Sequence, residues 1–184
     1  MENLDFENDV KIDEKATIVG NCRFGKNVKI KGVCYIENSI IEDNSVIINS
    51  MIVDSFVGKN CSIGPFSNLR KESKIHDNVK IGAFVEIKNS EIGENSKIPH
   101  HIYVGDAKIG KRVNVGCGVI FANYDGKVKR QSIVGDDVFI GCNVNIVAPV
   151  KIADKTYIWA ATTVTKDTAV GYFVIGRVRQ ENRN

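Results

Sequence analysis

A small set of cationic and aromatic residues recurs at related positions of one repeat. Arg70 and Lys88 each follow an apolar residue of that repeat, and Tyr103 directly precedes another. The segment 122–133 then carries Asn-Tyr-Asp-Gly, which is a turn signal, and three further cations that include Lys129. Cations that meet a tyrosine and a basic loop at one edge suit the binding of a phosphate group. Taken singly, Arg70 and Lys88 are ordinary solvated surface charges.

A second set of residues combines one imidazole with small side chains. The residues two positions beyond successive apolar residues of another column are Ala83, His100, Cys117, Cys142 and Ala160. Small side chains expose strand backbone, so an extended pantetheine-like chain can lie along them with its thioester beside His100. This favours His100 as a general base, whereas an isolated histidine more often has no role.

The elements that position these residues belong to a single repeat. A branched or large apolar residue recurs every five or six positions, often followed by glycine, and the segment from Ala122 to Ile133 is the only long gap. This period is the hexapeptide signature of a parallel β-helix, an all-β fold. Three short strands form one triangular coil, and the coils stack at roughly 4.8 Å per turn. Residues three repeats apart therefore stack on one face, with Arg70 and Lys88 projecting outward one coil apart.

The recurring apolar residues, called ladder residues below, fill the interior of the prism. A second interior position lies two residues before each ladder residue and holds smaller side chains. Three of the five cysteines occupy it, so they indicate small apolar residues in a reducing cytoplasm and no disulfide framework. We predict the following fillers for this position: Cys22, Val28, Cys34, Cys61, Val79, Val85, Val113, Val138, Val144, Val150, Thr156 and Thr162.

Composition and length limit the possible functions. The 184 residues are ample for one domain, and we expect coils over about 10–168 with a tail over 169–184. The net charge of +3 is too small to argue for nucleic acid. The sequence shows neither a CxxC metal site, nor a secretion signal, nor an apolar run long enough to span a bilayer. A cytoplasmic protein is expected.

Seven stretches in order resemble a known family from Ile63 to Gln180, and the first 62 residues fit its earlier coils less distinctly. The family is the acetyltransferase domain of the bifunctional bacterial N-acetylglucosamine-1-phosphate uridyltransferase/glucosamine-1-phosphate acetyltransferase. Its nucleotide-binding half is not found in this sequence, so we expect the acetyltransferase unit to stand alone. The matching stretches are IGPFSNLR (63–70), FVEIK (84–88), GDAKIG (105–110), NYDG (123–126), VGDDVFIG (134–141), VAPV (147–150) and TTVTKD (162–167).

This resemblance implies a fold, a reaction and a set of roles. The β-helix is expected to be left-handed, against the usual crossover preference, and to form homotrimers in which neighbouring chains share each site. The implied reaction transfers acetyl from acetyl-CoA, a co-substrate, to an amino-sugar phosphate, with glucosamine 1-phosphate as the first acceptor to test. His100 matches the general base. The sugar and phosphate contacts match Arg70, Lys88, Tyr103, Asn114, Asn123, Tyr124 and Lys129, and the coenzyme contacts match Cys142, Ala160 and Arg177.

Departures from the family and two other functions stay open. Cys142, Trp159, Ala161 and Ala83 replace residues common in the family, and Trp159 adjoins the coenzyme stripe. One alternative is a catalytically silent scaffold or regulatory protein that keeps sugar-phosphate binding. Another is a zinc hydratase on the same prism, which needs several ligating histidines where the sequence has only three. Direct transfer needs no covalent acyl-cysteine, although two cysteines lie on the stripe.

Overall fold

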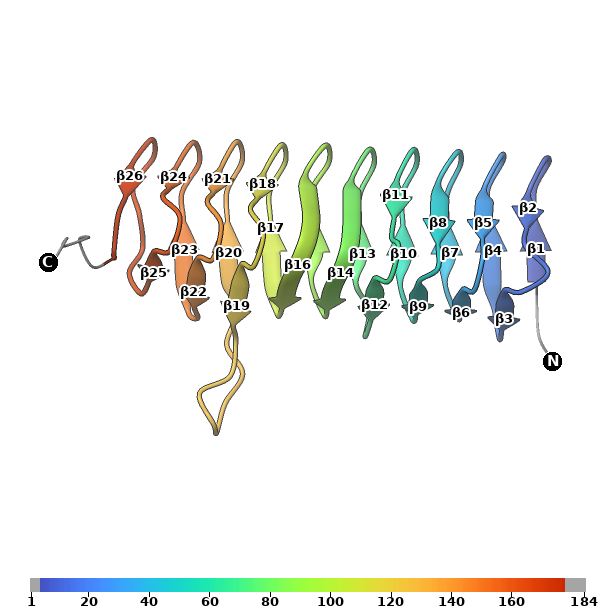
Figure 1. The fold of residues 1–184 in the computed structure, drawn as a ribbon, viewed down its shortest axis with the longest axis horizontal. Helices are drawn as coiled ribbons and strands as arrows, with labels where there is room; N and C mark the ends of the chain where they lie inside the picture. Colours follow the sequence, from blue (N-terminus) through green and yellow to red (C-terminus); the bar gives the residue numbers. More distant parts are fainter. Residues whose placement is uncertain (1–3, 178–184) are drawn as a thin grey trace, which may run out of the picture.

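The computed structural model describes residues 4–177 and consists of short strands wound into a parallel β-helix. Figure 1 shows the coils stacked along one axis, with the two ends of the chain at opposite ends of the stack. Every paired strand runs parallel to its partner in the next coil, and ladder residues face ladder residues, as in Ile81 opposite Ile98. Each hexad therefore forms one strand and one corner, as the sequence period predicts.

The strands form the three faces of a prism. Face 1 is a nine-stranded sheet, and it contains β1 (Leu4–Phe6), β4 (Cys22–Phe24), β7 (Ile40–Ile41), β10 (Phe56–Val57), β13 (Lys74–Ile75), β15 (Glu91–Ile92), β17 (Ala107–Ile109), β20 (Ser132–Val134) and β23 (Val150–Ile152). Face 2 contains β2 (Lys11–Ile12), β5 (Lys29–Lys31), β8 (Val46–Ile48), β11 (Ser62–Ile63), β18 (Asn114–Val115), β21 (Phe139–Ile140), β24 (Tyr157–Ile158) and β26 (Phe173–Val174). Face 3 contains β3 (Thr17–Val19), β6 (Tyr35–Glu37), β9 (Met51–Val53), β12 (Asn68–Arg70), β19 (Ile120–Ala122), β22 (Asn145–Val147) and β25 (Thr163–Val164).

Two long strands turn the corner between faces 2 and 3 without a break. They are β14 (Lys80–Lys88) and β16 (Lys97–Gly105), and they pair with each other along most of their length. Phe84 in β14 and His101 in β16 adopt left-handed backbone angles, with φ of 57° and 52°, at the bend. The bend leaves the preceding His100 on the outer surface of this corner.

The interior of the prism is filled by the predicted ladder. Ile36, Ile87 and Phe121 have no exposed surface, and the same holds for most of the other ladder residues. Ile12 and Ile18 are only partly buried because few coils lie beyond them. Burying each such side chain contributes roughly 1.5–3 kcal/mol, so the stack is held mainly by contacts between neighbouring coils.

The second interior position is confirmed for its cysteine, valine and threonine residues, all of which are buried. The same position also holds serines that composition alone did not single out as interior. Several of their hydroxyls donate to backbone carbonyls, for example from Ser45 to Gly58 at 2.7 Å and from Ser67 to Gly82 at 2.7 Å, whereas the buried Ser132 hydroxyl has no partner among residues 4–177. A hydroxyl therefore replaces an apolar filler where a corner carbonyl needs a partner.

The stack extends beyond the expected limits of about 10 and 168 at both ends. Strand β1 pairs with β4, where Phe6 stacks on Phe24 with ring centres 5.3 Å apart. Strand β26 pairs with β24, placing Phe173 beside Tyr157. Phe6 continues the interior ladder in register with the buried Phe24, whereas Phe173 contacts Tyr157 on the outer face. Residues 178–184 of the expected tail lie outside the described residues.

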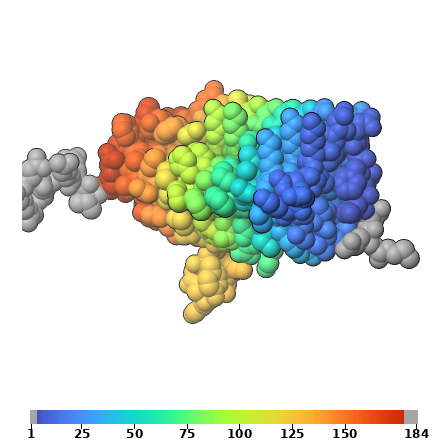
Figure 2. All heavy atoms as spheres, turned by 45° about the vertical axis from the view of Figure 1, so that its right-hand side comes forward, coloured from blue at the N-terminus to red at the C-terminus, as the bar shows by residue number. Residues whose placement is uncertain are grey.

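The excursion between β19 and β20 is a protruding hairpin, as predicted. Figures 1 and 2 show it standing away from the body of the prism. Tyr124 and Lys129 form an antiparallel bridge, and the carboxylate of Asp125 accepts hydrogen bonds from the backbone of Lys127 and Val128 at 2.9 and 2.7 Å. Among residues 4–177 there is no helix that could cross a membrane.

Candidate functional site

The corner between faces 3 and 1 holds a polar cleft of about 560 Å³. Lys88 at the end of β14, Asp106 between β16 and β17, and Lys129 from the hairpin line it together. The sequence placed Lys88 and Lys129 in one anion-binding set, and the structure brings these two side chains together. Asp54, Lys71, Glu72 and Asn89 complete the lining.

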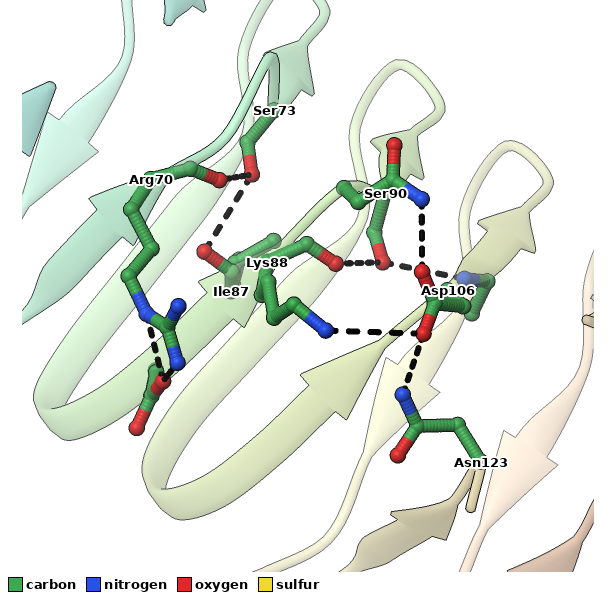
Figure 3. A network of polar contacts seen from close by, with 10 residues as sticks. Arg70, Ser73, Ile87, Lys88, Ser90, Asp106 and Asn123 are labelled. Carbon is green, nitrogen blue, oxygen red and sulfur yellow. Dashed lines mark hydrogen bonds and ion pairs between the residues drawn. The ribbon is translucent and has the colours of Figure 1, made fainter. Parts of the chain in front are cut away.

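Buried serines fix the backbone on which the two predicted cations stand. Ser73 Oγ contacts the carbonyl of Arg70 at 2.8 Å and that of Ile87 at 3.2 Å. Ser90 Oγ donates to the carbonyl of Lys88 at 2.8 Å (Figure 3). The backbone after each cation is therefore fixed by a hydrogen bond to a buried serine hydroxyl. This limits the positions that the cationic side chain can take.

Lys88 does not project freely into solvent, which corrects the sequence expectation. Its side chain is only 7% exposed, and its ammonium lies 3.6 Å from Asp106 Oδ2. A buried ammonium requires a nearby anion, and Asp106 supplies it from the next coil. Lys88 therefore presents its charge to the cleft from a fixed position.

Asp106 is the most connected side chain of the cleft. Its Oδ1 accepts a hydrogen bond from Asn89 Nδ2 at 2.5 Å, and its Oδ2 accepts one from Asn123. Burial alone raises the pKa of the Asp106 carboxyl, but the hydrogen bonds from Asn89 and Asn123 and the charges of Lys88 and Lys129 outweigh it and lower the pKa. The carboxylate is thus charged at neutral pH.

Arg70 also has an internal counter-ion. Its Nε and Nη2 both donate to Glu86 Oε1, at 2.8 and 2.6 Å. Glu86 lies on face 3 in register with Asn68 and Tyr103. The guanidinium is therefore directed across the middle of face 3, and Arg70 is not among the residues that line the cleft.

The Tyr103 side chain lies close to Gly105 at the C-terminal end of β16. A Cβ atom built on Gly105 would collide with the phenol of Tyr103 and lie 2.8 Å from Asn123 Nδ2. The absence of a side chain at Gly105 lets the Tyr103 hydroxyl lie against the backbone at the cleft. The structure thus brings the Tyr103 phenol close to Asn123, and its part in phosphate binding stays a prediction.

The hairpin residues divide between two environments. Asn123 is buried, with 8% of its surface exposed, and its amide is used by Asp106. Tyr124 is exposed, and its hydroxyl donates to the carbonyl of Gly126 at 2.7 Å. Asn123 therefore acts here as an anchor of the hairpin, whereas Tyr124 remains accessible on it.

His100 lies at a different corner, with the predicted stripe beside it. The backbone of His101 bonds to Gly118, that of Cys117 to Asn143, and that of Cys142 to Ala161, so the stripe continues over consecutive coils. Cys142 is exposed and Cys117 partly so. At roughly 4.8 Å per coil, the path from His100 to Ala160 is about 14 Å long.

Arg177 closes the far end of this stripe. Its Nη1 donates to the carbonyl of Ala160 at 3.0 Å, and its guanidinium lies 5.9 Å from the centre of the Trp159 ring. Tyr157 packs edge-on against Trp159 with ring centres 5.6 Å apart. The structure therefore gathers Cys142, Ala160 and Arg177 at one end of the prism.

Asn114 and His100 are among the predicted residues that do not line the cleft. Asn114 pairs with Lys97 and Phe139 on face 2, and His100 is separated from Gly105 by the width of face 3. Within one chain, five residues at roughly 3.3 Å each place up to about 16 Å between His100 and the cleft end of β16. One chain thus carries the imidazole and the buried lysine at separate corners.

Sequence reasoning missed the two carboxylates that organise the site, Asp106 and Glu86. Both lie inside stretches that were quoted for the resemblance, and each is paired with a predicted cation. The available signal was the register between neighbouring coils: Lys88 pairs with Gly105, so Asp106 directly follows the position opposite Lys88. Within the described range 4–177, no cluster of three His, Cys, Asp or Glu side chains is placed to hold a metal ion.

Comparisons with known proteins find relatives of this chain. The model of bacterial transferase hexapeptide repeats matches residues 131–166, and that of the GMPPB C-terminal domain matches residues 1–74. The bifunctional protein GlmU of Listeria welshimeri is 47% identical over 99% of this chain, and that of Clostridium kluyveri is 45% identical over 91%. The chain is a hexapeptide-repeat protein. It spans 41% and 36% of the length of these two relatives.

Solved structures show the same fold. A UDP-N-acetylglucosamine acyltransferase from Bacteroides fragilis superimposes with a TM-score of 0.69 at 23% identity, covering 86% of this chain and 66% of that one. Perosamine N-acetyltransferase from Caulobacter crescentus gives 0.55 at 20% identity, covering 66% and 57%. The predicted left-handed parallel β-helix of this hexapeptide-repeat protein is confirmed, as is its resemblance to the uridyltransferase/acetyltransferase family.

Proposed function

We propose that this protein is an acetyl-CoA-dependent N-acetyltransferase that acts on an amino-sugar phosphate, with glucosamine 1-phosphate as the first acceptor. The observation that supports it most directly is the stripe of small residues, with His100 at one end and Arg177 bonded to Ala160 at the other. The similarity to GlmU over nearly the whole chain supports the same reaction. A cytoplasmic location belongs to this proposal.

The reaction needs a neutral amine beside a fixed thioester. His100 accepts a proton from the sugar amine as its nitrogen attacks the thioester carbonyl carbon. The carbon–nitrogen bond forms, the carbon–sulfur bond breaks, and coenzyme A leaves as a thiol after receiving a proton. The stripe holds the pantetheine arm, and Arg177, which is already fixed by Ala160, pairs with the anionic end of the coenzyme.

Lys88, Lys129 and Arg70 hold the phosphate of the acceptor. Lys88 and Lys129 line the cleft, and Arg70 is paired with Glu86 on face 3. The Tyr103 hydroxyl lies at the same end of β16. Asp106 and Glu86 already neutralise the charges of Lys88 and Arg70. Phosphate binding therefore depends on the orientation of the cations as well as on the net charge of the site.

We further propose a homotrimer with shared sites. The amine and the phosphate of glucosamine 1-phosphate sit on adjacent ring carbons, so the base and the phosphate cations must meet around one sugar. His100 and the cleft occupy separate corners of a single prism, and the hairpin stands away from its body. A neighbouring chain that faces its His100 toward this cleft completes the site.

Release of thiol from acetyl-CoA against a panel of amino sugars and their phosphates tests the proposal. Glucosamine 1-phosphate should be acetylated, and glucosamine without phosphate should react with a much higher KM because it lacks the group that the cleft binds. A scaffold without activity is the alternative. Saturable acetyl-CoA binding in a calorimetric titration separates the enzyme from that scaffold even when the acceptor is wrongly chosen.

A further inference from the structure

We infer that Asp106 is a positioning residue that couples Lys88 to the protruding hairpin. The cation and the hairpin then act as one phosphate-binding unit. Only the identity of the phosphate ligand depends on the proposed function. Figure 3 shows the side chains of Lys88 and Asn123 converging on the Asp106 carboxylate from two different coils. Asn123 is the first residue after β19, where the hairpin begins.

The main chain of Asp106 holds the same two segments. Its N–H donates to the carbonyl of Lys88 at 3.1 Å, and its carbonyl accepts from the N–H of Ser132, the first residue of β20, at 3.2 Å. The hairpin is therefore tied to Asp106 at its start through a side chain and at its end through the backbone. Asp106 adopts a left-handed φ of 49°, which aspartate tolerates better than most residues.

The hairpin anchors transmit this position to Lys129. The N–H of Arg130 donates to the carbonyl of Asn123 at 2.8 Å, and Lys129 is bridged to Tyr124 across the hairpin. Moving Asn123 thus moves the strand that carries Lys129 into the cleft. The Lys88 ammonium forms an ion pair with Asp106 at 3.6 Å, and Lys88 lines the same cleft as Lys129.

Burial gives this arrangement its energetic weight. The Lys88 and Asp106 side chains are 7% and 13% exposed, so removing the carboxylate charge leaves an ammonium in the cleft without its counter-ion. It also weakens the acceptor for Asn89 and Asn123. The ion pair that positions Lys88 and the hydrogen bond that anchors the hairpin are then weakened by the same substitution. Two independent contacts would not be affected together.

Limited trypsinolysis of the protein without ligands tests the hold on the hairpin. The hairpin offers three cleavage positions, Lys127, Lys129 and Arg130, and cleavage there reports local opening. Asp106→Asn should raise the rate of hairpin cleavage at least about tenfold, as expected for loss of a charge-assisted hydrogen bond. Asp137→Asn is the matched control because it removes an exposed carboxylate that pairs with Arg112 at another corner. Equal rates in wild type and Asp106→Asn would overturn the inference.

The link to Lys88 has its own measurement. Inorganic phosphate, or glucosamine 1-phosphate in the absence of acetyl-CoA, should slow hairpin cleavage in the wild type and should not in Asp106→Asn. In steady state, Asp106→Asn should raise the KM for glucosamine 1-phosphate about tenfold or more and leave the KM for acetyl-CoA unchanged. Failure of turnover in every variant, with the trypsin result intact, would count against the proposed function and leave the role of Asp106 supported.

A double-mutant cycle separates coupling from general loss of structure. Asn123→Ala and the double variant Asp106→Asn/Asn123→Ala should show strongly non-additive cleavage rates, because both substitutions act on the same hydrogen bond: Asn123→Ala removes its donor, and Asp106→Asn removes the charge of its acceptor. If Asp106→Asn is cleaved throughout the coils, the substitution unfolds the protein and Asn123→Ala becomes the test. Asn123→Ala alone should then still increase cleavage in the hairpin. Additive effects, or an unchanged hairpin in Asn123→Ala, would contradict the coupling.

Discussion

The guanidinium of Arg177 lies 5.9 Å from the centre of the Trp159 indole ring and is bonded to the carbonyl of Ala160. This pairing puts the only tryptophan of the chain at the end of the coenzyme stripe. Trp159 is 41% exposed, so one part of its ring is open to a ligand. The contact makes the indole a reporter for whatever Arg177 binds.

Acetyl-CoA should therefore change tryptophan fluorescence saturably and protect Cys142 from thiol reagents over the same concentrations. Cys142 is exposed on the stripe, whereas burial raises the pKa of the Cys61 thiol to about 11 and keeps it unreactive. Labelling followed by mass spectrometry distinguishes the two thiols. Unchanged fluorescence together with full labelling of Cys142 would place the coenzyme elsewhere.

Arg177→Ala should weaken acetyl-CoA binding by roughly 10- to 100-fold, because charge-assisted hydrogen bonds to the coenzyme are lost. Binding of glucosamine 1-phosphate should not change. Arg112→Ala, at an exposed arginine paired with Asp137, provides the control. Calorimetric titration of both ligands measures the effect, and equal losses for both would indicate a structural role for Arg177.

His100→Ala should lower kcat by roughly 10²- to 10⁴-fold with little change in acetyl-CoA affinity, since a general base acts in the chemical step. His76→Ala is the comparison, because His76 bonds to Glu91 at 2.8 Å on face 1, away from the stripe. Stopped-flow or coupled thiol assays give kcat for each. A His100→Ala enzyme with wild-type kcat would remove this mechanism.

Mixing two inactive variants tests the shared site. Subunits with His100→Ala and subunits with Lys129→Ala should recover activity when unfolded and reassembled together, because some trimers then join an intact His100 corner to an intact cleft. Each variant refolded alone should stay inactive. A stable monomer in light scattering, or no recovery in mixtures, would rule out sharing.

The stability that Asp106 contributes should depend on pH in a defined direction. Its pKa is lowered in the folded state, so the contribution is complete above the ordinary aspartate pKa and is lost as the pH falls through the lowered value. Wild type should exceed Asp106→Asn in thermal midpoint near neutral pH, and the difference should shrink in acid. A difference that grows in acid would contradict the assigned charge state.

The sequence determined the β-helix and its loop because both follow from local rules. Apolar residues that recur every five or six positions are buried together when the chain winds into a β-helix. The segment from Ala122 to Ile133 lacks this period and therefore forms a loop outside the coils. The same phase placed Lys88 with Lys129 and His100 with Cys142. The terminal coils lie outside the expected range of about 10–168, although Phe6 and Val174 continue the ladder in register with Phe24 and Ile158.

Only the tertiary structure decided which charges meet. Asp106 and Lys88 are distant in the chain and become partners because the coils stack in register, with the Lys88 carbonyl bonded to the Asp106 backbone. The sequence period fixed the coil on which each residue stands, but the direction of a long side chain depends on the anions that surround it. The sequence period already placed His100 in another column than Lys88, and the structure adds the corner at His101, where the backbone turns onto face 3.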